Sequence, residues 1–287
     1  MCATCGCGDE GGVRVFGPGH LGHDDEPVRQ HEHGPGHPHE HQDGHAEGHE
    51  HDHGSGSGPA GRTVELQQKI LAKNDRLAEE NRTWLTARGI LAVNLMSSPG
   101  SGKTTLLERT ARDAGPRLGL AVIEGDQETT LDASRIQAAG CAVAQINTGV
   151  GCHLDASMIA SALRALDPGP GSVLVIENVG NLVCPALFDL GEAARVVLSS
   201  VTEGADKPVK YPQMFRGADL VLLTKVDLLP YVDFDTERHA RDLKAISPHA
   251  QILPVSATAG EGLPAWYDWL AGRAGQPSRA GDPAPTA

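Results

Sequence analysis

The chain has 287 residues and a formal net charge of −13, and its acidity is concentrated in residues 1–60, which hold 11 acidic and 2 basic side chains. The remaining residues are nearly balanced, with 26 acidic and 22 basic side chains, which argues against a nucleic-acid surface. The sequence shows no apolar run of membrane-spanning length, no secretory leader and no disulfide spacing among its six cysteines, so we expect a reducing, cytoplasmic setting without membrane contact.

Three cysteines, Cys2, Cys5 and Cys7, lie within residues 1–8, where glycines allow the chain to fold back. Three thiolates at this spacing can occupy three corners of one metal site, and they suit square-planar Ni²⁺ or tetrahedral Zn²⁺. Redox chemistry through Cys2 and Cys5 is the alternative, although no thioredoxin-like βαβ pattern follows them. We therefore predict a metal-binding motif at residues 1–8.

Residues 9–60 are predicted to be a disordered segment and linker, because they hold few large apolar side chains to offset the entropy of ordering. Neutral imidazoles at the density found here bind Ni²⁺, Zn²⁺ and Cu²⁺, whereas a solubilising polar tail is the alternative. A linker of about 50 residues would span roughly 40 Å and would let the cysteine motif reach the rest of the chain. The accessory metal ligands predicted in this segment are His20, His23, His31, His33, His37, His39, His41, His45, His49, His51 and His53.

The remainder is predicted to be one α/β domain, residues 89–272, preceded by an amphipathic helix within residues 61–88 and followed by a disordered tail, residues 273–287. The helix packs on the core or lines a dimer interface. Alternation of strands and helices predicts a mostly parallel sheet of about seven strands flanked by helices, with ligands at the carboxyl ends of the strands. The expected strands are 90–96, 120–124, 142–147, 173–177, 194–201, 219–224 and 251–255, and the expected helices lie near 103–114, 130–139, 154–166, 234–247 and 263–271.

The first strand runs into Ser97-Ser-Pro-Gly-Ser-Gly-Lys-Thr-Thr105, a Gly-rich loop that opens a helix. Small residues let the backbone N–H groups approach a polyphosphate, while Lys103 reaches the β and γ phosphates and Thr104 ligates Mg²⁺. An ordinary Gly-rich turn is the alternative. The sequence therefore predicts a P-loop fold, with nucleotide contacts from Gly100, Ser101, Gly102, Lys103, Thr104 and Thr105.

Two further strands end in carboxylates, at Asp126 and at Glu177. A carboxylate at the end of a buried strand can hold Mg²⁺ directly or through water, so we predict that Thr104, Asp126 and Glu177 form the magnesium site and, with Lys103, the catalytic set. Helix capping is the alternative for both acids. Gly180, three residues beyond Glu177, is expected to offer its N–H group to the γ-phosphate.

Recognition of guanine is predicted at Thr224-Lys-Val-Asp227, in which Asp227 accepts hydrogen bonds from the base and Lys225 lies over the ring. The motif of GTP-binding proteins has Asn where this chain has Thr224. Adenine cannot donate to Asp227 in the same way, so GTP is favoured over ATP. The backbone of Ser256 and Ala257 is expected to read the guanine oxygen.

Cys152, His153 and Cys184 are not required by GTP hydrolysis, yet they fall beside the predicted nucleotide segments. Two thiolates and an imidazole make a metal site whose geometry changes with the nucleotide state, while a packed cysteine and a capping histidine are the alternative. Cys141 enters an apolar strand and is expected in the core.

Taken together, these motifs resemble the HypB family, the nickel-incorporation GTPases that act in the maturation of nickel-iron hydrogenases. The resemblance covers Cys-x-x-Cys-Gly-Cys at the N-terminus, the His-rich insert, Lys69–Asn74, the P-loop, Asn147–Asp155, Glu177–Pro185 and Asp206–Pro212. It implies a GTPase that dimerises with nucleotide, a Ni²⁺ site at Cys2, Cys5 and Cys7, and a Ni²⁺ or Zn²⁺ site at Cys152, His153 and Cys184. The partners implied are a HypA-like nickel chaperone and the hydrogenase large-subunit precursor.

The predicted function is therefore that of a nickel metallochaperone with slow GTP hydrolysis, in which GTP and Mg²⁺ order the segments after Asp126 and Glu177 and set the geometry of the metal site. Two alternatives stay open. One is a related GTPase that serves urease, and the other is a nickel storage protein whose GTPase activity is incidental.

Overall fold

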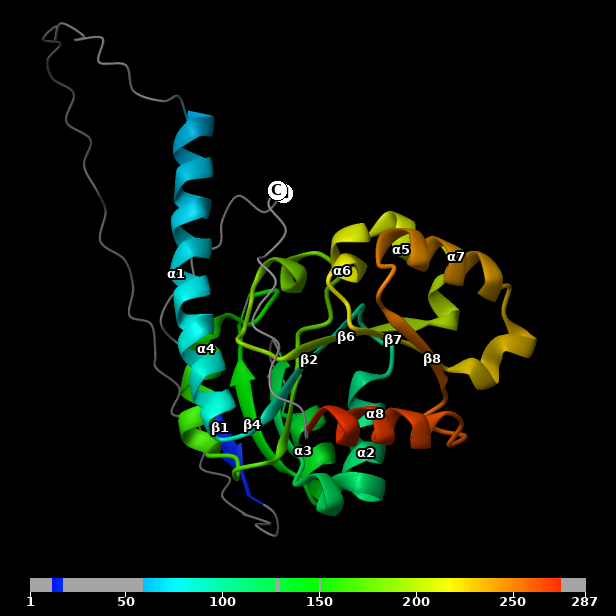
Figure 1. The fold of residues 1–287 in the computed structure, drawn as a ribbon, viewed down its shortest axis with the longest axis horizontal. Helices are drawn as coiled ribbons and strands as arrows, with labels where there is room; N and C mark the ends of the chain where they lie inside the picture. Colours follow the sequence, from blue (N-terminus) through cyan, green and yellow to red (C-terminus); the bar gives the residue numbers. More distant parts are fainter. Residues whose placement is uncertain (1–11, 18–58, 127–129, 150, 275–287) are drawn as a thin grey trace, which may run out of the picture.

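The computed structural model describes residues 12–17, 59–126, 130–149 and 151–274, which are drawn in colour in Figure 1. The cysteine motif at residues 1–8, all eleven histidines predicted as accessory ligands, and residues 275–287 lie outside the described residues. Among the described residues, no helix has both the length and the apolar character needed to cross a bilayer.

The described part of the chain forms one eight-stranded sheet with the order β1-β4-β3-β5-β2-β6-β7-β8. Every pairing is parallel except that of β1 with β4, which confirms the predicted mostly parallel sheet. The strands are β1 Val13–Phe16, β2 Leu91–Ser97, β3 Ala121–Asp126, β4 Ala142–Asn147, β5 Val173–Glu177, β6 Ala194–Ser200, β7 Leu220–Thr224 and β8 Gln251–Val255.

Helices cover both faces of this sheet (Figure 1). Alternate residues of the central strands pack on α2, α3 and α8 on one face and on α1, α4, α6 and α7 on the other, as the period of two along a strand requires. The helices are α1 Pro59–Ala87, α2 Lys103–Leu118, α3 Leu131–Ala138, α4 Ala156–Leu166, α5 Lys207–Lys210, α6 Pro212–Arg216, α7 Thr236–Ile246 and α8 Leu263–Ala274, with 3₁₀ turns η1 Cys184–Leu187, η2 Val201–Glu203 and η3 Val226–Tyr231.

Strand β1 corrects the prediction that residues 9–60 form a continuous disordered linker. Its register pairs Val13 with Ile146 and Phe16 with Val143 at the edge of the sheet. Four residues between glycines give too weak a pattern to predict a strand, and they form one here because β4 offers an unpaired edge. The prediction of a linker of about 50 residues between the cysteine motif and the domain is therefore wrong, because only residues 8–12 separate Cys7 from β1.

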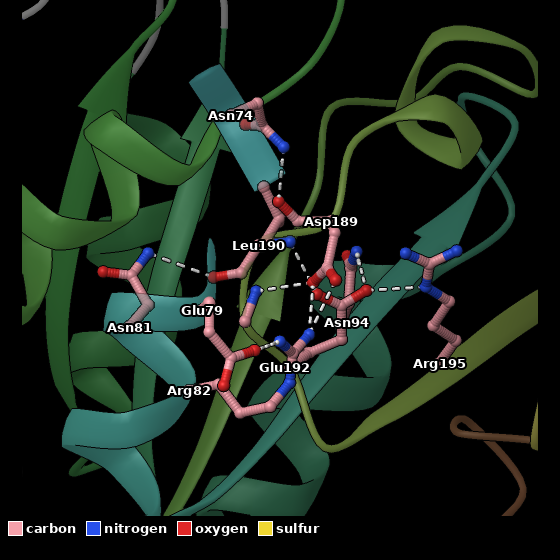
Figure 2. A network of polar contacts seen from close by, with 10 residues as sticks. Asn74, Glu79, Asn81, Arg82, Asn94, Asp189, Leu190, Glu192 and Arg195 are labelled. Carbon is pink, nitrogen blue, oxygen red and sulfur yellow. Dashed lines mark hydrogen bonds and ion pairs between the residues drawn. The ribbon is translucent and has the colours of Figure 1, made fainter. Parts of the chain in front are cut away.

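Helix α1 packs against α4, which agrees with the core-packing interpretation of the predicted amphipathic helix. Two of its buried side chains are amides that bridge other segments, as Figure 2 shows for the contacts with residues 189–190. Asn74 donates to the Asp189 carbonyl at 2.8 Å, and Asn81 donates to the carbonyls of Ala156 at 2.8 Å and Leu190 at 3.1 Å. The helix therefore joins the start of α4 to the segment before β6.

An ion pair also holds α1 to the segment before β6. Arg82 Nη2 donates to both carboxylate oxygens of Asp189, at 2.8 and 2.6 Å, and both side chains are partly buried (Figure 2). Gly191 has a φ of 88°, and a Cβ atom there would lie 2.6 Å from the carbonyl oxygen of Ala78. The backbone at residue 191 therefore contacts α1 directly, which only glycine permits.

Candidate functional site

The phosphate loop lies between β2 and α2 at the carboxyl edge of the sheet, as predicted. Gly102, with a φ of 97°, precedes the first turn of α2, so the N-terminal amides of the helix point into the loop. Lys103 is buried, and its Nζ donates to Ser97 Oγ at 2.9 Å. Burial lowers the pKa of Lys103, and the nearby Glu177 carboxylate opposes that effect. Ser97, unusual in such a loop, thus holds the lysine in place.

A cavity of about 560 Å³ opens over this loop, a volume in the range of small-molecule and cofactor pockets. Its lining brings together residues from the P-loop, the ends of β3 and β5, α3 and the segment after β7. The lining residues predicted from the sequence are Gly100, Gly102, Lys103, Thr104, Thr105, Asp126, Glu177, Gly180 and Lys225.

The predicted magnesium ligand Glu177 is one of two buried carboxylates at this site, and Glu124 is the other. Thr104 Oγ1 donates to Glu177 Oε1 at 2.8 Å, while Glu177 Oε2 and Glu124 Oε2 are buried without a hydrogen-bond partner. Burial raises the pKa of Glu177 to about 7, and burial with the Glu177 and Asp126 charges raises the pKa of Glu124 to about 9. Unpartnered carboxylate oxygens beside a threonine hydroxyl fit a hard cation such as Mg²⁺.

Glu124 was not predicted as a site residue, although it lines the cavity. A signal was available, because an acid within an otherwise apolar strand, two residues before Asp126, points to the same face as that residue. Glu203 on η2 was also missed. Its Oε1 accepts from Ser101 Oγ at 2.6 Å and its other oxygen accepts from Ser98 Oγ, so two hydrogen bonds hold the phosphate loop to η2. No local pattern reveals a contact across a hundred residues.

The segment predicted to recognise guanine is joined to the phosphate loop by two hydrogen bonds. Thr224 Oγ1 donates to the Ser101 carbonyl at 2.8 Å, and Lys225 Nζ donates to the Gly100 carbonyl at 2.7 Å. Asp227 keeps a buried Oδ1 without a partner, so this oxygen is open to a donor such as the predicted guanine. Lys225 lines the cavity, whereas Thr224 and Asp227 lie outside its lining.

Ser256 and Ala257 follow β8 in a tight loop, and they too lie outside the lining of the cavity. The Ser256 amide donates to the Glu261 carbonyl at 2.9 Å, and Ser256 Oγ accepts from the Ala259 amide at 3.0 Å. Arg109 of α2 approaches the Ala257 carbonyl at 3.5 Å. The loop is therefore internally braced and held to the helix that begins at the phosphate loop.

A second group of donors lies on the loops that follow β4 and β5, and none of its three residues lines the cavity. The ligand atoms of Cys152, His153 and Cys184 lie within 4.8 Å of one another, and all three residues are half-buried. His153 stacks on Phe188 with ring centroids 3.9 Å apart, and burial lowers its pKa, which favours the neutral imidazole that binds metals. Two sulfurs and one nitrogen fit Ni²⁺ or Zn²⁺ and leave a further coordination position for another ligand.

Cys184 begins η1, where Asn181 Oδ1 accepts from the amides of Val183 at 2.7 Å and Cys184 at 3.3 Å.

Cys141 has a different environment. It is buried, its Sγ donates to the Leu120 carbonyl at 3.1 Å, and burial raises its pKa to about 12, so it is a core residue as predicted.

The sheet order, the phosphate loop and the cavity at the carboxyl edge define a P-loop nucleotide-binding protein. Residues 91–254 match the family described as CobW/HypB/UreG, nucleotide-binding domain. The chain is 46% identical to hydrogenase maturation factor HypB of Escherichia coli K12, over 94% of this chain and 98% of that protein. It is 56% identical to HypB of Rhizobium leguminosarum bv. viciae, over 73% of this chain and 70% of that protein.

Solved structures agree with these relatives. The crystal structure of HypB from Archaeoglobus fulgidus is 44% identical with a TM-score of 0.67, covering 71% of this chain and all of that chain. HypB from Helicobacter pylori, in complex with nickel, is 39% identical with a TM-score of 0.68, covering 72% of this chain and 98% of that chain. The chain therefore belongs to the HypB family.

Proposed function

We propose that this protein is a nickel-binding GTPase that hydrolyses GTP to GDP and phosphate and supports nickel insertion into the large-subunit precursor of nickel-iron hydrogenase. The observation that carries the proposal is the position of the Cys152, His153 and Cys184 donors on segments that adjoin the nucleotide cavity. Nucleotide binding can then alter the geometry of the bound metal. The relative from Helicobacter pylori, whose structure is described as a complex with nickel, supports nickel as the cargo.

In this proposal Lys103 neutralises the β and γ phosphates, and Gly180 donates to the γ-phosphate. Thr104, Asp126 and Glu177 would hold Mg²⁺, which supplies charge neutralisation at the transferring phosphoryl group. Zn²⁺ competes for the thiolate site. Neither an arginine nor a glutamine is marked for catalysis by the sequence, so we expect slow turnover, on the order of 10⁻⁴ to 10⁻² s⁻¹.

The cysteine motif at residues 1–8 would deliver metal to the carboxyl edge of the sheet, where the loops that carry Cys152, His153 and Cys184 begin. Strand β1 supports this role because Val13 pairs with Ile146, near the end of β4 that leads toward Cys152. Cys7 lies six residues before Val13, so a tether of at most about 20 Å joins the motif to this edge. The histidines of residues 20–53 would serve as a reservoir between β1 and α1.

A GTP-promoted homodimer and docking to a HypA-like nickel chaperone would both take place in the cytoplasm. Support comes from the surface around Cys184, where the apolar side chains Val183 and Leu187 are each 55% exposed. Apolar side chains that cluster on a surface favour contact with a partner, so we infer a docking surface at these two residues.

The test measures GTP turnover and bound nickel on the purified full-length chain, with and without added Ni²⁺, and hydrogenase activity in cells that lack the endogenous gene. Lys103→Ala is expected to abolish turnover and hydrogenase maturation, whereas Lys73→Ala, which removes an exposed lysine of α1, leaves both unchanged. Maturation that survives Lys103→Ala at limiting nickel would contradict the proposal.

A urease role is the second candidate, because a Helicobacter pylori relative, 41% identical over 73% of this chain, is named hydrogenase/urease maturation factor HypB. Separate assays of hydrogenase and urease in the same cells decide between the two. Removing residues 20–53 tests nickel storage as the main function. Full maturation at ample nickel without this segment would argue against storage.

A further inference from the structure

A buried asparagine connects the nucleotide segment to the metal segment. Asn178 follows Glu177 directly and is only 1% exposed. Its Oδ1 accepts two hydrogen bonds, from the Val179 amide at 3.0 Å and from the Leu154 amide at 3.3 Å. Val179 precedes Gly180, the predicted γ-phosphate contact, and Leu154 follows His153. One oxygen atom thus holds both segments.

The side chain of Asn178 is itself held from the far side. Its Nδ2 donates to Asn94 Oδ1 at 3.2 Å, and Asn94 in turn donates to Glu192 at 3.3 Å; the Asn94 and Glu192 pair is drawn in Figure 2. Arg195 donates to the same Glu192 oxygen at 2.7 Å. The amide of Asn178 therefore has a fixed orientation, and its oxygen cannot follow either backbone segment freely.

Leu154 also contacts the other predicted nucleotide segment. It is fully buried, and a Cβ atom placed on Gly125 would lie 2.8 Å from both of its methyl carbons. Gly125 lies between Glu124 and Asp126 at the end of β3, so Leu154 packs directly on the backbone of the predicted magnesium segment. The same loop is held to β3 at its start, where the Thr148 amide donates to the Asp126 carbonyl at 2.9 Å.

We propose that Asn178 and Leu154 are the positioning residues through which the nucleotide state sets the separation of Cys152 and His153 from Cys184. This inference rests on the proposed function and names the contacts that carry its coupling. When the γ-phosphate draws the Val179 and Gly180 amides away, the fixed Asn178 oxygen loses the Val179 amide, and its hydrogen bond to the Leu154 amide tightens. His153 then moves with Leu154, while Cys184 stays with η1.

The experiment uses the full-length chain carrying Cys2→Ser, Cys5→Ser and Cys7→Ser as the reference protein. In this background, thiolate-to-nickel charge-transfer absorption reports on Cys152 and Cys184, because imidazole ligands of the histidine segment give no such band. Ni²⁺ is titrated against a competing chelator with GDP and with a non-hydrolysable GTP analogue. The measured quantity is the ratio of the two nickel dissociation constants, expected to differ from one by at least about fivefold.

Asn178→Ala in this background is expected to bring the ratio within about twofold of one. The matched control is Asn81→Ala, which also removes a buried amide bonded to two backbone segments but contacts neither nucleotide segment. The control is expected to lower stability and to keep the ratio. Leu154→Val keeps the amide hydrogen bond, but its shorter side chain no longer packs fully on Gly125, so we expect a smaller ratio. If Asn178→Ala does not fold, Leu154→Val alone is the test.

A folded Asn178→Ala protein with the full ratio overturns the inference and leaves the proposed function intact. Collapse of the ratio in Asn81→Ala as well shows general loosening and also overturns it, as does a full ratio in Leu154→Val when that variant serves alone. A ratio of one in the reference protein contradicts the coupling in the proposed function itself, so the two failures are distinguishable.

Discussion

Replacing Thr224 with valine removes one hydroxyl and almost no volume from the junction between the guanine-recognition segment and the phosphate loop. The hydroxyl donates to the Ser101 carbonyl at 2.8 Å, and Thr224 is 5% exposed. A net hydrogen bond contributes about 1 kcal/mol, and a buried carbonyl that loses its donor costs about 1–3 kcal/mol. We expect the free energy of unfolding to fall by about 1–3 kcal/mol.

Urea unfolding of the nucleotide-free protein measures this change, and at a slope of about 2 kcal/mol per molar it lowers the midpoint by about 0.5–1.5 M. The same hydrogen bond orients the loop before nucleotide arrives, so we also expect the dissociation constant of a fluorescent GDP analogue to rise about threefold to tenfold. Thr224→Ser keeps the hydroxyl and is the control. Valine and threonine proteins of equal stability and GDP affinity would refute the reasoning, as would a serine protein as impaired as the valine protein.

Two further predictions concern residues away from the cavity. Gly191→Ala places a Cβ atom 2.6 Å from the Ala78 carbonyl oxygen, at a residue whose φ is 88°. We therefore expect thermal unfolding to show that the free energy of unfolding falls by at least about 2 kcal/mol. A decrease below about 1 kcal/mol would contradict the direct contact with α1. His239 is fully buried against the Ala205 carbonyl, beside Phe234 and Asp242, and burial lowers its pKa below the ordinary 6.5. The unfolded state therefore binds this proton more readily, so the stability contributed by neutral His239 is present above about pH 6.5 and is lost as the pH falls below it. His239→Gln should flatten the pH dependence of urea unfolding between about pH 5 and 7, and an unchanged slope would exclude His239 as its source.

The phosphate loop was predictable because its chemistry is local. Glycines, Lys103 and Thr104 must follow one another between a strand and a helix, and the sequence preserves that order. Glu203 was not predictable, because it meets Ser101 only after the chain has crossed β3, β4, β5 and β6. The position of β1 was hidden for another reason: four residues acquire a strand only from the edge they pair with.

The grouping of Cys152, His153 and Cys184 could be predicted because parallel strands bring their following loops to one edge of the sheet. The ring of Phe188 on His153 could not, since stacking depends on how η1 turns after Cys184. Sequence patterns thus predicted the donor types, and packing determines their orientation.

Four buried asparagines supply many of the polar connections behind the site. Asn74, Asn81, Asn94 and Asn178 are each at most 5% exposed, and each bonds to segments distant in the sequence. An asparagine can donate and accept without a charge, so it joins two backbone segments at lower desolvation cost than an ion pair. Leaving either end unpaired would be costly, so such a junction has a few discrete arrangements rather than a continuum. A γ-phosphate that displaces one segment by a small distance would therefore switch the hydrogen bonding of the next, as the proposed coupling of nucleotide and metal requires.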